Sequence, residues 1–310
     1  MTTPPRTHTA GTTGITRATG MQDTAFTAAR PRLFAIAYRM LGSRADAEDV
    51  LQDAWMRWHQ TDPSTLQSAE AWLVTVVTRL SIDRLRAAKT EREAYVGWWL
   101  PEPLVEPEAD TPTPEKAVEL AGDLSMALLW VLERLSPEER AAFLMRQVFD
   151  QDYAEIAALL GKTEAACRQM VHRASDRVQQ ERPRFDVSHD AHRDLLARFA
   201  EASRTGQRDA IRALLADDAQ LVGDGGGKVP SFTRIIQNAE QITKIYCELV
   251  QHMGDEVRYV PAQVNGEPGL LRYVDGQLES AQSFVIENGR IVAIYVVRNP
   301  DKLAHIHIGA

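Results

Sequence analysis

The sequence predicts a multidomain protein in which two all-α domains, the second with a helix-turn-helix, precede an α+β domain. Three observations lead to this fold class. Apolar residues recur at intervals of three and four over residues 24–89 and 115–182, which is helical spacing. Residues 152–178 contain two short amphipathic segments that meet at a glycine. After residue 187, β-rich segments alternate with Asx-Gly turns.

The first domain is expected over residues 24–89 as three or four helices, after a disordered Thr-, Ala- and Gly-rich tail over residues 1–23. One apolar stripe with three-four spacing consists of Ala47, Val50, Leu51, Ala54, Trp55 and Trp58. Such stripes usually form a core. The tryptophans of this domain, Trp72 included, are therefore expected to pack inside it rather than to stack on bases.

Three carboxylates lie opposite this stripe, at Asp46, Asp49 and Asp53. Like charges at this spacing repel by about 0.3 kcal/mol per pair. Ser43 can cap the helix, and an acid in the first turn suits the helix dipole, which accounts for Asp46. A basic partner surface that docks on Asp49, Gln52 and Asp53 is the functional alternative to a solvated face.

The third predicted helix presents Thr75, Arg79, Asp83 and Arg86 on one outward face, beside Arg84 and Lys89. A basic stripe of this kind is often only solvated, but it also suits nucleic acid. The polar loop over residues 61–68 precedes this helix and could lie over a strand of nucleic acid.

Residues 90–114 form a linker dominated by prolines and acids, which contains the segment YVGWWLPEP over residues 95–103. Two adjacent tryptophans are costly when exposed in a connection between domains. Trp98 and Trp99 are therefore expected to dock on a neighbouring domain.

The second helical domain, residues 115–182, contains a strong helix start at Ser136 with Glu139 three residues later, and it ends in the helix-turn-helix. The inward residues are Ile156, Ala157 and Leu160 on the first helix and Cys167, Val171, Ala174 and Val178 on the second. Gly161 allows the turn, and Thr163 can cap the second helix. An ordinary helical hairpin is the alternative, but the outward Arg168, Gln169, His172 and Arg173 favour a recognition helix in the major groove.

Composition places the 310-residue chain among globular proteins, with 44% apolar residues and a net charge of −8. No apolar run is long enough for a membrane span, no secretory signal begins the chain, and a cytoplasmic protein is expected. Cys167 and Cys247 have no metal-ligand spacing, so no metal, cofactor or disulfide is predicted. Basic and acidic residues are segregated along the chain, which indicates weak DNA binding alone and help from a larger partner.

These motifs, in this order, resemble the extracytoplasmic-function sigma factors of bacterial RNA polymerase. Residues 45–53 and 71–86 are similar to the second region of that family, and residues 152–178 to its fourth. The 95–103 segment and the C-terminal extension resemble the SigJ-type subgroup, whose members carry a SnoaL-like domain. The resemblance implies an alternative sigma factor that binds core RNA polymerase, recognises the −35 and −10 promoter elements and initiates transcription.

The resemblance also implies roles by position. The β′ clamp helices of polymerase are expected to bind at Asp49, Gln52 and Asp53, and the β flap is the second expected polymerase contact. Contact with the −10 element falls to Arg79, Asp83, Arg86 and Lys89, and contact with the −35 element to Lys162, Arg168, Gln169, His172 and Arg173. Residues 61–71 match the loop that captures a flipped −10 base. His172 and Met170 depart from many relatives, so the preferred −35 sequence cannot be copied over. The free protein is expected to be monomeric.

The C-terminal domain, residues 187–310, is expected to have helices over 191–204 and 209–216 and strands over 257–264, 270–274, 279–287 and 290–298, with hairpin turns at Asp275-Gly276 and Asn288-Gly289. It resembles the cone-shaped fold of SnoaL-like and ketosteroid-isomerase-like proteins, in which helices close over a curved sheet and leave a pocket that could hold a small ligand.

Two motifs in this domain are linked by resemblance to control of sigma activity: Asp224, Gly225, Gly226, Gly227 and Lys228, and Asn299, Pro300, Asp301 and Lys302. The first lacks the spacing of a phosphate-binding loop. The hypothesis is that the domain packs against the first domain or the Trp98-Trp99 linker. One alternative is an isomerase-like enzyme with Asp217, Asp218 or Asp224 as general base. Another is a helix-turn-helix regulator, fused to a small-molecule-binding or isomerase-like domain, that works without polymerase.

Overall fold

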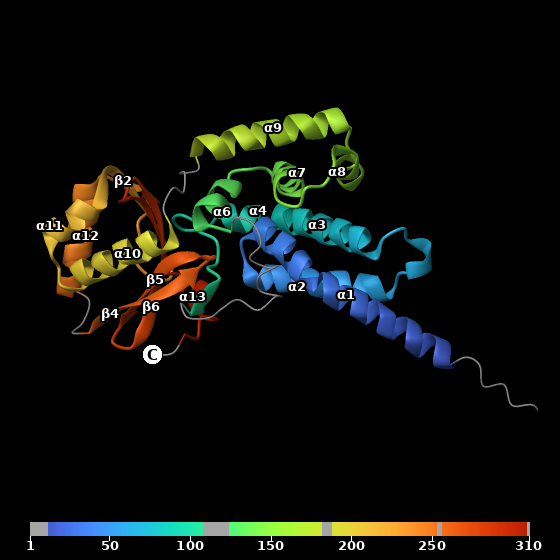
Figure 1. The fold of residues 1–310 in the computed structure, drawn as a ribbon, viewed down its shortest axis with the longest axis horizontal. Helices are drawn as coiled ribbons and strands as arrows, with labels where there is room; N and C mark the ends of the chain where they lie inside the picture. The colour runs from blue at the N-terminus through green and yellow to red at the C-terminus, as the bar shows by residue number, and fades with distance from the viewer. Residues whose placement is uncertain (1–11, 108–123, 182–187, 253–255, 309–310) are drawn as a thin grey trace, which may run out of the picture.

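The computed structural model describes residues 12–107, 124–181, 188–252 and 256–308, and it has a helical half and an α+β half side by side (Figure 1). In chain order the helical half contains α1 (Thr12–Leu41), α2 (Arg44–His59), the 3-10 helix η1 (Pro63–Thr65), α3 (Ala69–Ala87), α4 (Lys89–Glu93), α6 (Met126–Leu132), α7 (Pro137–Gln147), α8 (Tyr153–Leu160) and α9 (Glu164–Glu181). The fold class expected from the sequence is confirmed.

The first helix begins earlier than expected. Residues 12–23 belong to α1 rather than to a disordered tail, while residues 1–11 lie outside the described residues. Gln22 ties this part of α1 to the end of α2, because its Nε2 donates to the carbonyls of Trp58 (3.2 Å) and Thr61 (2.9 Å). In return, Trp58 Nε1 donates to the Gln22 carbonyl at 2.9 Å. These contacts join residues 36 and 39 positions apart, so composition alone could not indicate them.

The prediction that the tryptophans pack inside the first domain holds for Trp58 but is wrong for Trp55. Trp58 is 1% exposed, whereas Trp55 is 43% exposed. Trp55 lies at the edge of the apolar stripe, where it borders a groove between α1 and α2 together with Phe26. Its ring packs against His59, with ring centroids 4.1 Å apart.

The helix-turn-helix forms as the sequence predicts. Capping boxes start α7 at Ser136 and α8 at Asp152. Gly161 ends α8 with φ 63, a left-handed conformation that glycine adopts without strain, and Thr163 caps α9 through a 3.2 Å hydrogen bond from the backbone nitrogen of Ala166. The inward stripe of α9 is buried as expected. In α8, Leu159 takes the buried place expected of Leu160, which is only partly covered.

The C-terminal domain contains α10 (His189–Arg204), α11 (Arg208–Leu214), β2 (Leu215–Asp224), β3 (Ile236–Gln237), α12 (Ala239–His252), β4 (Val257–Val264), β5 (Glu267–Val274), β6 (Gln277–Glu287), β7 (Arg290–Val297) and α13 (Pro300–Leu303). The helix expected over residues 209–216 is α11, which ends at Leu214, and β2 begins at the next residue. Both predicted hairpin turns form, with positive φ at Asp275, Gly276, Asn288 and Gly289, which is the type I′ pattern.

A seven-stranded sheet in the order β1-β4-β5-β6-β7-β2-β3 organises this domain. Only the β2–β7 pair is parallel among the strands that the structure describes. One face packs on α10 and α12 through Phe199, Tyr246 and Phe284. The strand at one edge of the sheet, β1 (Val105–Pro107), comes from the linker and pairs with β4, with Val105 opposite Val264. The linker is thus part of the C-terminal sheet.

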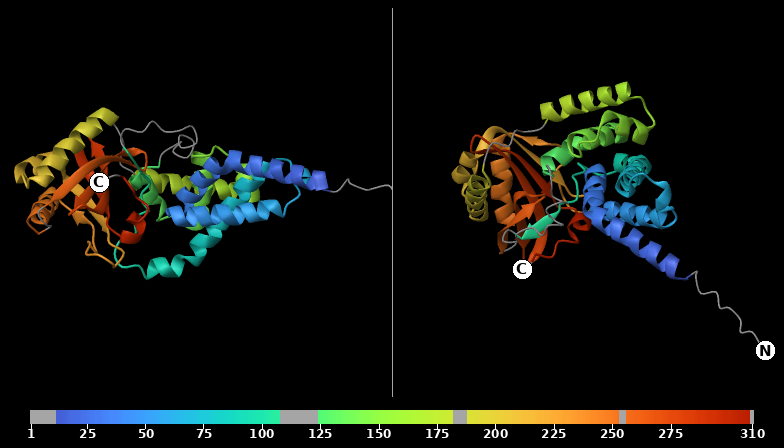
Figure 2. Two further views of the ribbon diagram at one scale, coloured as in Figure 1. Left: turned by 90° about the horizontal axis from the view of Figure 1, so that it is seen from below. Right: turned by 45° about the vertical axis from the view of Figure 1, so that its right-hand side comes forward.

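The opposite face of the sheet covers α6, the first described helix of the second domain. Met126, Ala127 and Trp130 of α6 share one apolar cluster with residues of β5, β6 and β7. Leu128, Leu129, Val131 and Leu132 belong instead to the core of the helical half. All seven residues of α6 are buried, as expected of a helix that is apolar on every side. Figure 2 shows the sheet beside the helices in two further orientations.

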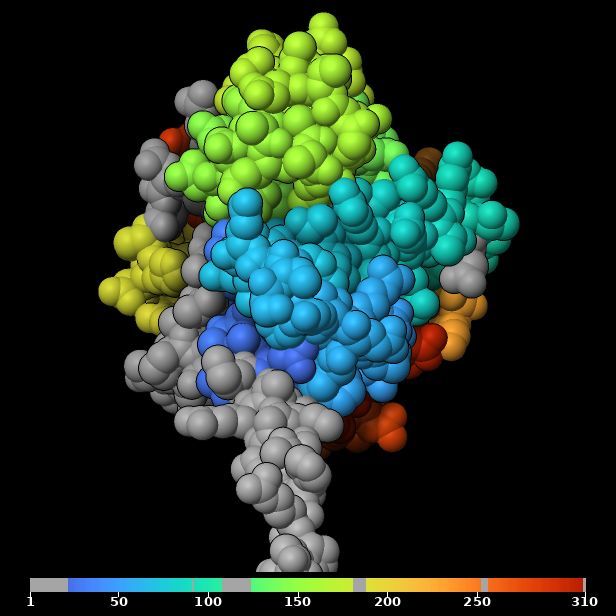
Figure 3. All heavy atoms as spheres, turned by 90° about the vertical axis from the view of Figure 1, so that its right-hand side faces the viewer, coloured from blue at the N-terminus to red at the C-terminus, as the bar shows by residue number. Residues whose placement is uncertain are grey.

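The two helical domains pack directly on each other. In Figure 3 the helices after residue 124 sit on those of the first domain without a gap. Their buried residues form one continuous cluster that includes Leu33 and Val77 on one side and Leu144 and Met145 on the other. Helix α9 lies on the far side of α7 and α8 from α3 (Figure 1).

Candidate functional site: the linker contact and the polar helix faces

Asp224, at the end of β2, is fully buried, and its carboxylate holds the linker. Oδ1 accepts from the hydroxyl of Tyr95 (2.6 Å) and from the backbone nitrogen of Gly226 (3.0 Å). Oδ2 accepts from the backbone nitrogen of Leu100 (2.9 Å) and from Nζ of Lys302 (2.7 Å). Because Tyr95 and Leu100 belong to the linker, this carboxylate joins two parts of the chain that are remote in sequence.

Two residues of the C-terminal tail motif complete the arrangement. Asn299 Nδ2 donates to the Tyr95 hydroxyl at 2.9 Å, and Lys302 Nζ also donates to the Leu100 carbonyl at 2.5 Å. We call Tyr95 and Leu100, together with Asp224, Asn299 and Lys302, the linker contact. The sequence pointed to both motifs, and the structure brings them together.

The glycines after Asp224 are required by close packing. A Cβ on Gly226 would overlap the Asn299 amide, and one on Gly227 would lie 3.1 Å from Cβ of Val96 in the linker. Gly226 and Gly227 also have φ 61 and 70, where side chains are strained. The Gly-rich segment therefore serves as a surface against which the linker lies.

Both tryptophans of the linker dock as expected. Trp99 lies between two cations, the Arg92 guanidinium at 4.1 Å and the Lys302 ammonium at 3.9 Å from its ring centroid. It also packs so near Gly42 that a Cβ there would lie 3.1 Å from its ring. Trp98 packs edge-on against Trp130 of α6, with centroids 5.4 Å apart. The pair thus touches both the first and the second helical domain.

Glu102 fastens the other end of the linker to the start of α2. Its backbone nitrogen donates to the Gly42 carbonyl (2.8 Å), and its carbonyl accepts from the Tyr38 hydroxyl (2.6 Å). Its carboxylate accepts from the backbone nitrogen of Arg44 (2.8 Å) and pairs with His305 at 3.0 Å. Burial alone would raise the pKa of Glu102, but the hydrogen bonds from His305 and Arg44 lower it below its ordinary value.

The linker contact is an electrostatic unit with little access to water. Burial lowers the pKa of Lys302, and the adjacent Asp224 carboxylate opposes that shift by stabilising the ammonium. Burial, together with the hydrogen bond to Asp224, raises the pKa of Tyr95, so Tyr95 stays a neutral hydrogen-bond donor. A buried ion pair whose partners are all hydrogen-bonded holds one geometry, because breaking it would leave an unpaired charge in the interior.

The three carboxylates considered as general bases lie in two different environments. Asp224 is fully occupied by the linker contact. Asp217 and Asp218 are exposed on β2, and Asp217 pairs with Arg212. The sheet face beneath α10 and α12 holds buried polar groups instead, including an ion pair between Arg272 and Glu279 at 2.6 Å.

The acidic face of α2 is exposed. Asp49, Gln52 and Asp53 all lie at the surface, and Asp49 and Gln52 line the groove of about 280 Å³ that Trp55 borders. Asp46 has a local role, as expected, since Ser43 caps the helix beside it and Arg84 pairs with it at 2.6 Å.

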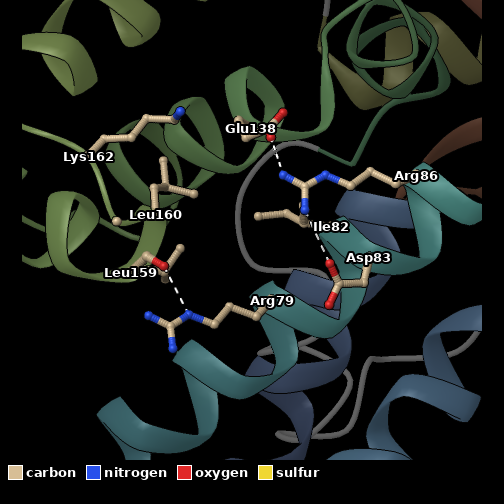
Figure 4. Close-up of a pocket in the computed structure, with 9 residues that line it drawn as sticks. Arg79, Ile82, Asp83, Arg86, Glu138, Leu159, Leu160 and Lys162 are labelled. Atoms are coloured by element: carbon tan, nitrogen blue, oxygen red, sulfur yellow. Dashed lines mark hydrogen bonds and ion pairs between the residues drawn. The ribbon is translucent and has the colours of Figure 1, made fainter.

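The polar face of α3 meets the second helical domain rather than solvent alone. Arg79, Asp83 and Arg86 line a cavity of about 360 Å³ whose far wall is formed by Glu138, Gly161 and Lys162 (Figure 4). Lys89 lies outside it and pairs with Glu93 of the same short helix at 3.7 Å.

The outward face of α9 is exposed as expected. Arg168, Gln169, His172 and Arg173 are all at the surface. Arg168 pairs with Glu164 at 2.6 Å, and His172 pairs with Asp176 at 2.8 Å, both within one turn of the helix. Lys162, placed with this set by sequence, lies at the turn after α8 and lines the cavity on the side opposite α3 (Figure 4).

Comparison with known proteins defines the class. Residues 25–91 match the Sigma-70 region 2 family and residues 125–178 match the Sigma-70 region 4 family. A helix-turn-helix domain preceded by a region 2 domain belongs to a sigma factor, so the chain is an alternative sigma factor for transcription initiation. With 37% identity over 91% of its length to an ECF RNA polymerase sigma factor, it belongs to the extracytoplasmic-function (ECF) sigma factors.

Named relatives support this membership over nearly the full length. The chain is 37% identical to the ECF RNA polymerase sigma factor SigJ of Mycobacterium tuberculosis, over 91% of this chain and 93% of the relative. It is 29% identical to the probable ECF sigma factor SigI of the same species, over 90% and 93%. The crystal structure of M. tuberculosis SigJ matches with a TM-score of 0.74 at 34% identity, covering 91% of this chain and 98% of that one.

Several residues that hold the linker in place were not predicted from the sequence. Tyr95, Leu100 and Glu102 lie in the segment that was singled out, but only its tryptophans were assigned a contact. Tyr38 and Asn265 were not noticed, although Asn265 Nδ2 donates to the Tyr38 hydroxyl at 2.7 Å and its backbone nitrogen donates to the Leu104 carbonyl at 2.7 Å. Asn265-Gly266 is an Asx-Gly turn like the two that were recognised, and that pattern could have located it.

Described residues contain no helix with the length and apolar character of a membrane span.

Proposed function

We propose that the C-terminal domain regulates this sigma factor in cis by holding the linker between the two DNA-binding domains. The observation that carries the proposal is the buried Asp224 carboxylate, which accepts from Tyr95 and Leu100 of the linker. A sigma factor must spread its two helical domains along the promoter, since one reads the −10 element and the other the −35 element. A linker fixed to the C-terminal sheet opposes that separation, so the domain acts as a restraint.

The experiment is transcription in vitro with core RNA polymerase and full-length variants. Lys302→Met removes the buried ammonium that bridges Asp224 and the Leu100 carbonyl, and it should raise promoter output several-fold. Lys228→Met is the matched control, because Lys228 belongs to the Gly-rich motif but pairs with Asp301 at the surface. Equal promoter output from the parent protein, Lys302→Met and Lys228→Met would show that the C-terminal domain does not restrain transcription. Reduced output from Lys302→Met would show that the domain activates transcription instead.

We propose that the exposed polar faces of α2, α3 and α9 contact polymerase and promoter DNA. Asp49, Gln52 and Asp53 would receive the basic β′ clamp helices. On α9, Arg and Gln side chains suit guanine and adenine edges, each good pair contributing about 1–3 kcal/mol of discrimination. We propose that the −10 element is contacted by Arg79, Asp83, Arg86 and Lys89, and that the −35 element is contacted by Arg168, Gln169, His172 and Arg173 on α9 and by Lys162 from the turn before it.

The remaining assignments belong to the same proposal. The chain acts in the cytoplasm, without catalytic activity of its own, and the second helical domain also contacts the β flap. Occupation of Asp224 by the linker, and exposure of Asp217 and Asp218, support a regulatory rather than an enzymatic C-terminal domain. A small ligand under α10 and α12 would be detected as a rise in melting temperature with ligand concentration.

A further inference from the structure

A buried ion cluster lies in the C-terminal domain, on the sheet face that packs on α10 and α12. Oε2 of Glu279 on β6 accepts from Nε of Arg272 on β5 at 2.7 Å. Oε1 of the same carboxylate accepts from Nε of Arg298, which follows β7. The side chains of Arg272, Glu279 and Arg298 are only 2%, 14% and 20% exposed. We call these three residues the buried triad.

A β-bulge places Glu279 on this face of the sheet. Two successive residues of β5 lie opposite Ser280 and Leu278 of β6, so Glu279 between them is an extra residue. Leu278 and Ala281 both pack with the apolar cluster on the α6 face, although strict alternation would send residues three apart to opposite faces. The extra residue restores this pattern and turns the Glu279 carboxylate towards Arg272, because a bulge re-aims side chains.

Arg298 joins the buried triad to the linker contact. Its backbone nitrogen donates to the Asp224 carbonyl at 2.7 Å, and the backbone nitrogen of Asn299 donates to the same oxygen at 3.0 Å. Nη1 of Arg298 donates to the carbonyl of Pro230, in the loop that continues from the Gly-rich segment. One residue therefore ties together the end of β2, the loop after it and the tail motif. Asp224 in turn holds the linker through its carboxylate.

The charges of the buried triad make this arrangement depend on Glu279. One carboxylate neutralises two guanidinium groups, so its loss would leave two like charges close together with little water to screen them. Arg272 is enclosed, whereas Arg298 is the more exposed of the two arginines and would turn towards water. That movement would withdraw Arg298 from the Pro230 carbonyl and shift the start of the tail motif that follows it.

We propose that Glu279 and Arg298 are positioning residues of the linker contact. Their ion pair fixes the start of the tail motif, so that Asn299 and Lys302 reach the linker in the geometry described above. The inference rests on the proposed restraint of the linker and extends its control into the interior of the C-terminal domain. A change under α10 and α12 would then release the linker as effectively as a change at Asp224 itself.

Native-state hydrogen exchange of the full-length chain tests this role. Arg298→Met removes one guanidinium and leaves the ion pair between Glu279 and Arg272, so no buried charge loses its last partner and the variant should fold. The backbone amides of Leu100, inside the linker contact, and of Glu102, beyond it, report release of the linker. Both amides should exchange about tenfold faster in the variant than in the parent protein.

Glu279→Gln removes the other half of the ion pair and should accelerate exchange of the same amides by about tenfold. The double variant should stay within about twofold of the faster single variant, because both substitutions remove one contact. Tyr246→Phe is the matched control, since it deletes a buried hydroxyl that donates to Gln282 at 2.9 Å on the same sheet face, a bond that involves neither Glu279 nor Arg298. It should lower the free energy of unfolding but leave linker exchange within about twofold of the parent rate.

The outcomes separate this inference from the proposed restraint. If the linker amides keep the parent rate in Arg298→Met, the buried triad is only structural and the inference is wrong. Equal acceleration by Tyr246→Phe would overturn it as well, because the linker would then respond to any loss of stability. Multiplied effects in the double variant would show that the two residues do not act through one ion pair. Transcription with core polymerase tests the restraint alone: faster linker exchange with unchanged output in both Arg298→Met and Lys302→Met would refute the restraint and leave the positioning role standing.

Discussion

Replacing Asp224 by asparagine probes the linker contact most directly. The substitution keeps the shape of the side chain but removes the charge that faces Lys302 at 2.7 Å, in a site where Asp224 is 0% exposed. It also puts an amide donor where two acceptor oxygens are needed. Breaking a buried, hydrogen-bonded ion pair costs about 3–5 kcal/mol, so the free energy that keeps the linker docked should fall by about 3 kcal/mol. Since about 1.4 kcal/mol corresponds to tenfold, the undocked fraction should rise roughly a hundredfold.

Native-state hydrogen exchange measures this opening directly. The informative amides are Glu102, which donates to the Gly42 carbonyl (2.8 Å), and Asn265, which donates to the Leu104 carbonyl (2.7 Å). Neither touches Asp224, so faster exchange there reports release of the linker as a unit.

Asp301→Asn is the matched control for this measurement. It removes the same charge from a neighbouring carboxylate that is 64% exposed and pairs only at the surface with Lys228, so its effect should stay below about 1 kcal/mol. If exchange at the two amides rises less than threefold in Asp224→Asn, or equally in both variants, the linker is not held by Asp224 and the reasoning fails.

Three further outcomes are expected. Burial and the nearby His189 lower the pKa of His192 to about 4. The free energy of unfolding should therefore fall as the pH falls from about 6.5 towards 4, by about 2 kcal/mol at pH 5. Denaturant titration at pH 7 and pH 5 should show a smaller fall for His192→Phe than for the parent protein. Arg168→Ala should reduce discrimination among −35 variants by about 1–3 kcal/mol in promoter-library transcription, and unchanged preferences would exclude that contact. Asp53→Asn should weaken binding to core polymerase with promoter preference intact; a changed preference would place Asp53 elsewhere.

The local elements and the two helical domains could be predicted from the sequence, because periodicity, capping and turn chemistry act over a few residues. The stripe on α9, the Ser136 capping box and the Asx-Gly hairpins all formed as those rules require. Motif order was enough to indicate the family. The same short-range rules failed at residues 12–23 and at Trp55, where contacts between distant segments decide the outcome.

Tertiary structure alone decided which surfaces meet. The side chains of Asp224 and Tyr95 are 129 positions apart, and Arg79 and Leu159 are 80 apart, so no periodicity links them. Burial then determines what each charge does. An aspartate enclosed with a lysine holds a linker, and an arginine stripe that could meet DNA is paired with the end of a neighbouring helix.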